Sequence, residues 1–397
     1  MSSQAFLSHM DVWRILPDAP IFLSPVKSCL ANGATFLVAV IFSQLVSHAP
    51  PLQWPWTLYT LNYANYYAFL PDYRLGVPTL WHTYYVPETI PAALRETHSL
   101  RAVLMTRLLT VWVVSLSYQK WQRGIFSPFR DEDCFWVVTQ TNIHPFVQHV
   151  FNITFGVIGR SVISFLLALT VADAVAQPHT ALVASDYILA TLAILAILTA
   201  FVAESQRTSF EIFSGQLSFL RWHIKWFDSR IQWTEHDAER GFVTRGLWAW
   251  SRHPDLLCEL IFWFIFNLFP ILSPNSPELN VPPASHIPLT SLLPCLSLCL
   301  WTSISTLLVD SYKRVQYPAY AAYQARVAMF VPLLTPVWGA LLRRYGRKDV
   351  DMLVYGDGTS PEEKEMMDKA NMGGRPRYRW RKWRSMADRL GLANPEK

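Results

Sequence analysis

The stretch Gly246-Leu-Trp-Ala-Trp-Ser-Arg-His-Pro-Asp-Leu-Leu-Cys-Glu259 runs directly into an uncharged segment that extends from Leu260 to Pro277. An arginine, a histidine and a carboxylate therefore stand at the mouth of a segment whose composition is typical of a membrane helix. Charged side chains at such a boundary are costly to desolvate, and they commonly hold a polar or anionic group. The stretch places the candidate chemistry of this chain at a membrane surface.

The composition of the chain is that of a polytopic membrane protein. Of its 397 residues, 51% are hydrophobic and 16% are charged, whereas soluble domains carry about 25% charged residues. The five cysteines are scattered and have no metal-ligand spacing, so neither a zinc site nor a disulfide framework is predicted. We expect an all-α fold, a polytopic transmembrane helix bundle of about seven spans.

Candidate spans are the uncharged or nearly uncharged segments of sufficient length. The second of them is rich in Tyr and Asn and could lie in the membrane interface instead of crossing it. The third and fourth contain Arg107 and Arg160, which indicates either a functional charge with a partner such as Glu204 or a span that is tilted, shifted or broken. The seven segments are Ser28–Ser47, Trp54–Leu70, Val103–Gln119, Phe146–Ala172, Ile188–Ala203, Leu260–Ser273 and Pro288–Val309.

The distribution of Lys and Arg between the spans predicts an orientation. Residues 120–145, residues 205–255 and the C-terminal tail are rich in these cations, whereas residues 174–185 and 274–287 contain none. Because cytosolic loops carry an excess of Lys and Arg, the basic segments and the C-terminus are predicted to lie in the cytosol.

The chain divides by composition into an N-terminal cytosolic or interfacial segment (1–27), the transmembrane bundle (28–336) and a soluble basic tail (337–397). From Ala340 onward the tail has 14 Lys and Arg against 9 Asp and Glu, so it carries the whole net charge of +5. Residues 375–384 interleave six cations with three aromatic residues. This pattern favours contact with anionic lipid over nucleic-acid binding, and a merely solvated tail is the alternative.

The motif Ser251-Arg-His-Pro254 has the features of an anion site at a helix start. Proline is favoured at the first helical position, and the free N–H groups and dipole of that end attract phosphate. Arg252 could grip a phosphate with its guanidinium and His253 could donate a second hydrogen bond, while Glu259 would need a polar partner such as a ribose hydroxyl. The alternative is a juxtamembrane anchor in which Arg252 and His253 reach the interface and Glu259 pairs with a cation.

Three further clusters fall at predicted cytosolic ends of spans. In residues 310–326, Tyr320, Tyr323 and Arg326 are three apart and share a helix face, although tyrosine belts at membrane interfaces are common. An acidic and aromatic cluster occupies residues 131–136, and residues 203–207 close the fifth span. A nucleotide held at this side of the bundle could reach a lipid within it.

Together these motifs resemble the steroid 5-alpha-reductase-like membrane proteins, specifically their uncharacterised subgroup, over roughly residues 54–332. The resemblance implies a helix bundle in the endoplasmic reticulum that holds NADPH at the cytosolic ends of its C-terminal helices. It also implies hydride delivery to a carbon–carbon double bond polarised by a conjugated carbonyl. No catalytic proton donor is assigned. By motif position, the resemblance assigns cofactor binding to Gln206, Arg252, His253, Glu259, Lys313, Tyr320 and Tyr323.

Several positions depart from the family pattern. Asp255 and Leu256 replace a usual Asn-Tyr, Ser115 and Phe135 stand where an Arg is common, and Asp310 stands where a Glu is usual. We expect an integral membrane, NADPH-dependent oxidoreductase of a sterol, isoprenoid or enoyl-type lipid. It would contact membrane lipids and no nucleic acid, need no metal, and have an oligomeric state that the sequence leaves open. The alternatives are a non-catalytic lipid-binding protein and an S-adenosylmethionine-dependent membrane methyltransferase, because isoprenylcysteine methyltransferases have a similar Arg-His-Pro element.

Overall fold

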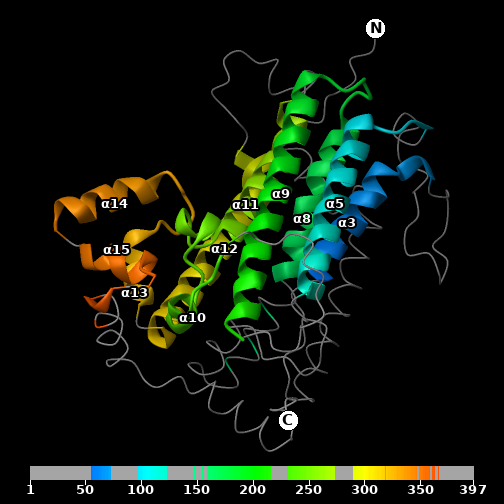
Figure 1. Ribbon diagram of the computed structural model, residues 1–397. Helices are drawn as coiled ribbons and strands as arrows, with labels where there is room; N and C mark the ends of the chain where they lie inside the picture. The colour runs from blue at the N-terminus through cyan, green and yellow to red at the C-terminus, as the bar shows by residue number, and fades with distance from the viewer. Residues whose placement is uncertain are drawn as a thin grey trace, which may run out of the picture. The chain divides into compact units, whose positions relative to one another are not determined.

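The structure is a computed structural model that describes residues 55–72, 96–122, 159–215, 231–272, 289–317, 319–346 and 348–357, with a few isolated positions outside these ranges. Within these residues the chain is helical and contains no strand (Figure 1). The predicted all-α membrane bundle is confirmed in class. The predicted span Ser28–Ser47, the cluster at 131–136 and the basic segment 375–384 lie outside the described residues.

Six of the described helices are long, with 14 to 30 residues each. Four are long and apolar enough to cross a bilayer, namely α5, α9, α11 and residues Leu292–Gln316 of α12, and α8 contains a shorter apolar stretch. α5, α9, α11 and α12 agree with the third, fifth, sixth and seventh predicted spans, and they extend beyond most of the hydropathy limits because polar residues continue the helices at their ends. α8 begins at Arg160, so it overlaps the fourth predicted span, Phe146–Ala172, only from that residue onward. The helices are α3 (Pro55–Ala68), α5 (Leu100–Gln122), α8 (Arg160–Ala176), α9 (Ala184–Phe213), α11 (Pro254–Ile271) and α12 (Leu289–Gln316).

The remaining elements are short. They are η1 (Leu70–Asp72), α10 (Glu235–Arg240), η4 (Gly246–Ala249), α13 (Tyr320–Arg326), α14 (Leu334–Arg344) and α15 (Lys348–Tyr355). The capping of α10 shows why such a short helix forms. The Thr234 side chain accepts from the Asp237 N–H and the Asp237 carboxylate accepts from the Thr234 N–H, while Gly241 ends the helix in a left-handed conformation.

The helices belong to two compact units. Unit 1 holds α3, α5, α8, α9 through Ser205, α11 from Asp255 and α12 through Ser305. Unit 2 holds the remaining residues of α9 and α12, together with α10, η4, Pro254, α13, α14 and α15. The predicted boundary between residues 336 and 337 therefore falls inside α14, so the first helices of the expected soluble tail are part of a folded unit.

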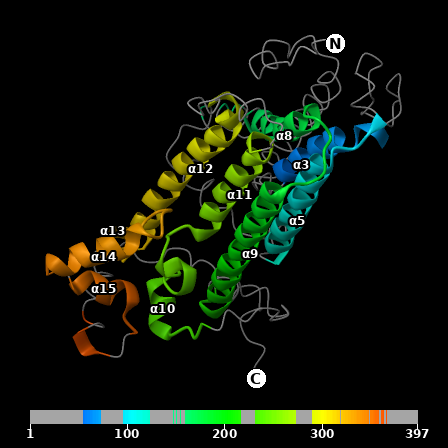
Figure 2. The same ribbon diagram turned by 90° about the horizontal axis from the view of Figure 1, so that it is seen from above.

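In unit 1, α3 packs against α5 and α8, and α5 packs against α8 (Figures 1 and 2). Tyr63, Tyr66 and Tyr67 of α3 are fully buried. The Tyr-rich segment that could have been interfacial is therefore a core helix, because its tyrosines share the face that packs on its neighbours. Aromatic stacking adds to this core, with the Trp112 and Phe262 rings nearly parallel and their centroids 4.7 Å apart.

An ion pair is buried in unit 1 at the start of α5. Arg101 Nε donates to Asp186 Oδ1 at 2.8 Å and Arg101 Nη2 donates to Asp186 Oδ2 at 3.1 Å. The two side chains are 4% and 1% exposed. Arg107, which the sequence marks as the unusual charge, is exposed and lies over the Phe69 ring. Arg101 gives no signal in the sequence, because it precedes the apolar segment that begins at Val103.

We expect Arg101→Ala to lower the free energy of unfolding by about 3–5 kcal/mol, because it leaves the buried Asp186 carboxylate without its cation. Arg107→Ala, on the same helix, is the control and should change stability by less than about 0.5 kcal/mol. Unfolding in detergent measures both. Equal effects of the two substitutions would contradict this assignment.

Candidate functional site

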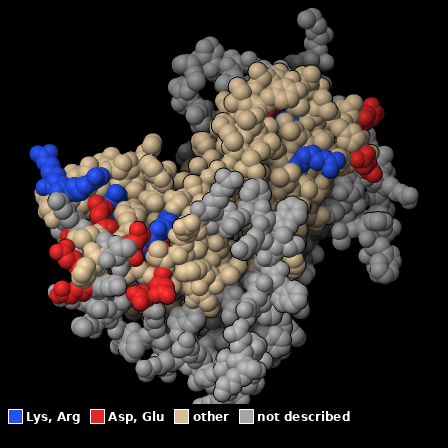
Figure 3. All heavy atoms as spheres, viewed as in Figure 1, with Lys and Arg blue, Asp and Glu red and all other residues tan. Residues whose placement is uncertain are grey.

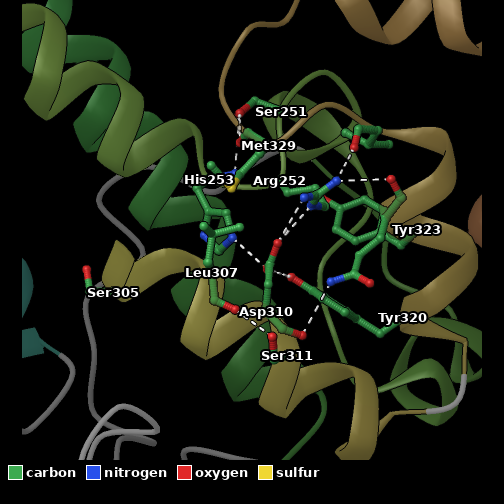
Figure 4. A network of polar contacts seen from close by, with 12 residues as sticks. Ser251, Arg252, His253, Ser305, Leu307, Asp310, Ser311, Tyr320, Tyr323 and Met329 are labelled. Atoms are coloured by element: carbon green, nitrogen blue, oxygen red, sulfur yellow. Dashed lines mark hydrogen bonds and ion pairs between the residues drawn. The ribbon is translucent and has the colours of Figure 1, made fainter. Parts of the chain in front are cut away.

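The carboxylate of Asp310, near the end of α12, is the hub of a buried network in unit 2 (Figure 4). Its Oδ2 accepts from Arg252 Nε at 3.2 Å and from Arg252 Nη2 at 2.9 Å. Its Oδ1 accepts from the Tyr320 hydroxyl at 2.5 Å and lies 2.8 Å from His253 Nε2. Asp310 is 3% exposed. Both oxygens of this carboxylate are therefore bonded inside the protein.

The other terminal nitrogen of Arg252, Nη1, is also hydrogen-bonded. It donates to the carbonyl oxygens of Gln324 at 3.0 Å and Val327 at 2.6 Å. The Arg252 backbone N–H donates to Ala328 O, and the His253 N–H donates to Met329 O. The Arg-His-Pro segment is thus paired with the segment that follows α13, and every nitrogen of the guanidinium has a protein acceptor.

The tyrosines of α13 complete the network. Tyr323 donates its hydroxyl to the carbonyl oxygen of Trp248 at 2.6 Å, and both Tyr320 and Tyr323 are 1% exposed. Their rings pack on Phe242, with centroids 5.0 Å and 5.3 Å away. Burial, and then the neighbouring Asp310 carboxylate, raise the pKa of Tyr320 above its usual value. Tyr320 therefore remains a protonated donor at neutral pH.

Gln206 and Lys313 occupy other parts of unit 2. Gln206 Oε1 accepts from the Leu247 N–H at 2.9 Å. The close approach requires glycine at residue 246, where φ is +68° and a Cβ would lie 2.5 Å from that oxygen. Lys313 is half-buried, and its Nζ lies 5.7 Å from the centroid of the Tyr320 ring. Lys313 therefore keeps a cation at the surface of the network.

Glu259 belongs to a cavity in unit 1. This cavity has a volume of about 200 Å³ and contains three carboxylates and one lysine in its lining. Its apolar wall includes Trp112, whose indole N–H is buried without a hydrogen-bond acceptor among the described residues. The polar lining consists of Thr57, Ser117, Gln119, Lys120, Glu204, Asp255, Glu259, Thr302 and Ser305. The pocket thus joins an apolar wall to an acidic polar surface.

Comparison with the prediction shows which assigned residues come together. Arg252, His253, Tyr320 and Tyr323 share one network, and Lys313 lies beside it, over the Tyr320 ring. Gln206 lies elsewhere in the same unit, and Glu259 lines the cavity of the other unit. The four network residues direct their polar groups at protein acceptors, so they do not fit a dinucleotide phosphate directly. The sequence does not single out Trp112, because a tryptophan in an apolar helix carries no signal of an unsatisfied N–H. Asp310 stands out in the sequence only as the first residue of the 310–326 cluster and as a departure from the family pattern.

We expect Asp310→Ala to destabilise the protein by about 3–5 kcal/mol, because the buried Arg252 loses its counter-ion. Tyr320→Phe should cost about 1.5–3 kcal/mol, the range for a hydrogen bond to a charged group. Tyr345→Phe is the matched control, since Tyr345 is 78% exposed. Unfolding midpoints in detergent test the series, and a Tyr320→Phe variant as stable as the control would contradict the network.

Comparison with known proteins places the chain in a family. Residues 76–327 match the family model described as "Protein of unknown function (DUF1295)". An uncharacterized protein of Schizosaccharomyces pombe is 26% identical over 237 residues, which cover 59% of this chain and 64% of that relative. The matched region thus spans just under two thirds of the relative's length. No solved structure matches the chain. Because the family model covers most of the chain, this protein belongs to the DUF1295 family, a steroid 5-alpha-reductase-like family of unknown function.

Proposed function

We propose that this protein is an NADPH-dependent reductase of the endoplasmic reticulum membrane that reduces a polarised carbon–carbon double bond of a lipid, with its C-terminus in the cytosol. One observation supports this most strongly. The Arg-His-Pro motif and the tyrosine motif, more than 60 residues apart in the sequence, meet on the Asp310 carboxylate. The motifs by which the chain resembles reductases therefore form one structure, as the resemblance requires.

In this proposal the network positions the site and does not itself bind the cofactor. Arg252 and His253 hold the approach to α11 on Asp310, and Tyr320 holds α13 on the same carboxylate. NADPH supplies the hydride when it is bound. Lys313, half-buried at the end of a membrane-spanning helix, is the residue we assign to a cofactor phosphate.

The cavity of unit 1 is assigned to the polar end of the lipid. The Trp112 side chain lines this cavity and its N–H is a buried donor without an acceptor among the described residues, so we assign it to a carbonyl oxygen of the substrate. A donor in this position would also stabilise the negative charge that develops on that oxygen during reduction. Glu259, predicted to bind cofactor, is assigned here to the polar surface around the substrate, because it lines the same cavity.

NADPH at about 100 times its dissociation constant should stabilise the purified protein by about 2.7 kcal/mol, since a ligand stabilises the state that binds it. Lys313→Glu should weaken NADPH binding by about tenfold or more through the reversed charge at a phosphate contact. Arg314→Glu is the control, because Arg314 is an exposed cation at the next position of α12.

Thermal unfolding with NADPH, NADH and S-adenosylmethionine in parallel separates the possible classes. Stabilisation by S-adenosylmethionine alone would indicate a methyltransferase. No stabilisation by NADPH at millimolar concentration would overturn the reductase proposal.

Trp112→Phe should lower turnover by about 10²- to 10³-fold, the range for loss of one donor to a developing oxyanion. The ring stacking on Phe262 is kept by a phenyl side chain, so the fold should survive. NADPH consumption with sterol, isoprenoid and enoyl lipids that carry a conjugated carbonyl is the assay. Trp121→Phe is the control because Trp121 is 57% exposed, and an equal loss in both variants would rule out a specific role for Trp112.

The commitment of every Arg252 nitrogen to protein acceptors favours a second candidate, a non-catalytic lipid-binding protein. In such a protein the motif would persist for stability after cofactor binding was lost. Neither NADPH nor S-adenosylmethionine would then stabilise the protein, whereas a lipid that fills the cavity would. The cofactor and lipid arms of the same unfolding experiment therefore distinguish the two candidates.

A further inference from the structure

Helix α14 has one face that is fixed to unit 2. Thr335 Oγ1 accepts from the Ala328 N–H at 3.0 Å and donates to Trp250 O at 2.6 Å. One turn later, Gly339 packs so closely on Arg326 that a Cβ would lie 2.5 Å from the guanidinium carbon. Because residues four apart share a helix face, these contacts fix the rotation of α14 about its axis.

The opposite face of α14 is apolar and exposed. Leu334, Val337 and Leu341 are 42%, 53% and 46% exposed and follow the three- and four-residue spacing of one helix face. Leu333, just before the helix, is 77% exposed, and Tyr345, just after it, is 78% exposed. A continuous row of large apolar side chains is rarely left in water without a function.

All charged residues of α14 are basic. The helix contains no Asp or Glu and ends with the exposed residues Arg343 and Arg344. Figure 3 shows basic side chains gathered at the left edge, where the end of α14 lies in Figure 1. On the adjoining helix α15, Asp351 is engaged by Arg326 at 2.5 Å. An apolar row with basic and aromatic residues at its end is typical of helices that lie in the interface of an anionic bilayer.

Unit 2 is covalently continuous with a helix that can cross a bilayer. Its residues include the last turns of α12, one of the four helices able to cross a membrane. With 28 residues, α12 is about 42 Å long, which exceeds the roughly 30 Å of the hydrocarbon core. The end of this helix therefore reaches the headgroups, and only a short stretch of chain joins it to α14.

We propose that α14 is an interfacial anchor whose Leu334, Val337 and Leu341 lie at the acyl boundary of the bilayer, with Arg343 and Arg344 on anionic headgroups. The site would take a phospholipid surface rich in negatively charged lipid. This anchor does not depend on the reductase proposal, because it rests on a different surface of unit 2. A second copy of the chain, or another segment of the same chain, could cover this face only with a surface that is apolar and acidic. The crosslinking test below detects either of these occupants.

The test places a photo-crosslinking amino acid, benzoylphenylalanine, at Val337 in the full-length protein reconstituted in nanodiscs that contain phosphatidylserine. Irradiation should give a covalent adduct with the mass of one phospholipid. Glu239→benzoylphenylalanine is the control, because the Glu239 side chain is 62% exposed on α10, and it should give no lipid adduct.

The charge requirement is tested with the double variant Arg343→Glu and Arg344→Glu carrying the same crosslinker. Because both cations favour contact with an anionic surface, reversing their charges should lower the yield of the lipid adduct at least about fivefold. Unfolding midpoints equal to those of the parent protein show that the variant is folded. A crosslink to a second copy or to a peptide of the same chain, or equal lipid adducts from Val337 and Glu239, would overturn the proposal.

Discussion

A buried carboxylate, that of Asp310, is the constraint on which unit 2 depends. A carboxylate removed from water is tolerated only when its oxygens are bonded and its charge is balanced. Arg252 balances the charge, while His253 and Tyr320 complete the bonding. Those three residues come from the approach to α11 and from α13, so one functional group determines where both segments lie. Loss of any one donor leaves the Asp310 carboxylate with an unsatisfied oxygen and weakens the hold of the other donors on it. The three contacts are therefore cooperative.

This constraint changes how the motif is interpreted. An arginine and a histidine just before a helix-starting proline are typical of phosphate recognition. Here the helix start is real, since α11 begins at Pro254, but the two side chains are bonded to Asp310. The motif predicts that Arg252 and His253 make polar contacts, but it cannot predict their acceptor. That acceptor, Asp310, lies in α12, 57 residues after His253.

The fold was more predictable than the site for a physical reason. Hydropathy reports the apolar surface that each helix buries, and that signal is local, so the sequence locates the apolar parts of α5, α9, α11 and α12. It does not locate their ends, because polar residues continue the helices, and α9 extends to Phe213 beyond the predicted limit at Ala203. The Arg101–Asp186 ion pair and the unsatisfied Trp112 N–H depend on residues brought together by packing, and neither leaves a local pattern. The Tyr-rich helix α3 lies between these cases, because hydropathy located it but packing decided that it is in the core.

Two charge environments follow from the structure, and they suit different ligands. The cavity of unit 1 has three carboxylates against one lysine, which disfavours a polyanion such as a dinucleotide phosphate. In unit 2 the network carboxylate is already balanced, and Lys313 adds a positive charge beside it. If the protein is a reductase, its phosphate contacts therefore belong with unit 2, and the neutral or hydrogen-bonding end of its lipid belongs with the cavity.

The C-terminal helices belong to the same physical unit as the motif. Val350 and Val354 of α15 are buried with Phe242, Tyr320 and Tyr323. The guanidinium of Arg240 donates to the carbonyl oxygens of Leu353 and Gly356, and its burial lowers its pKa despite the neighbouring Asp237. Residues that composition assigned to a soluble tail thus pack with Tyr320, which bonds to Asp310, and with Tyr323, which bonds to Trp248 O. The boundary between the helix bundle and its tail cannot be drawn from charge content, because a charged helix such as α15 still buries Val350 and Val354 in the core of unit 2.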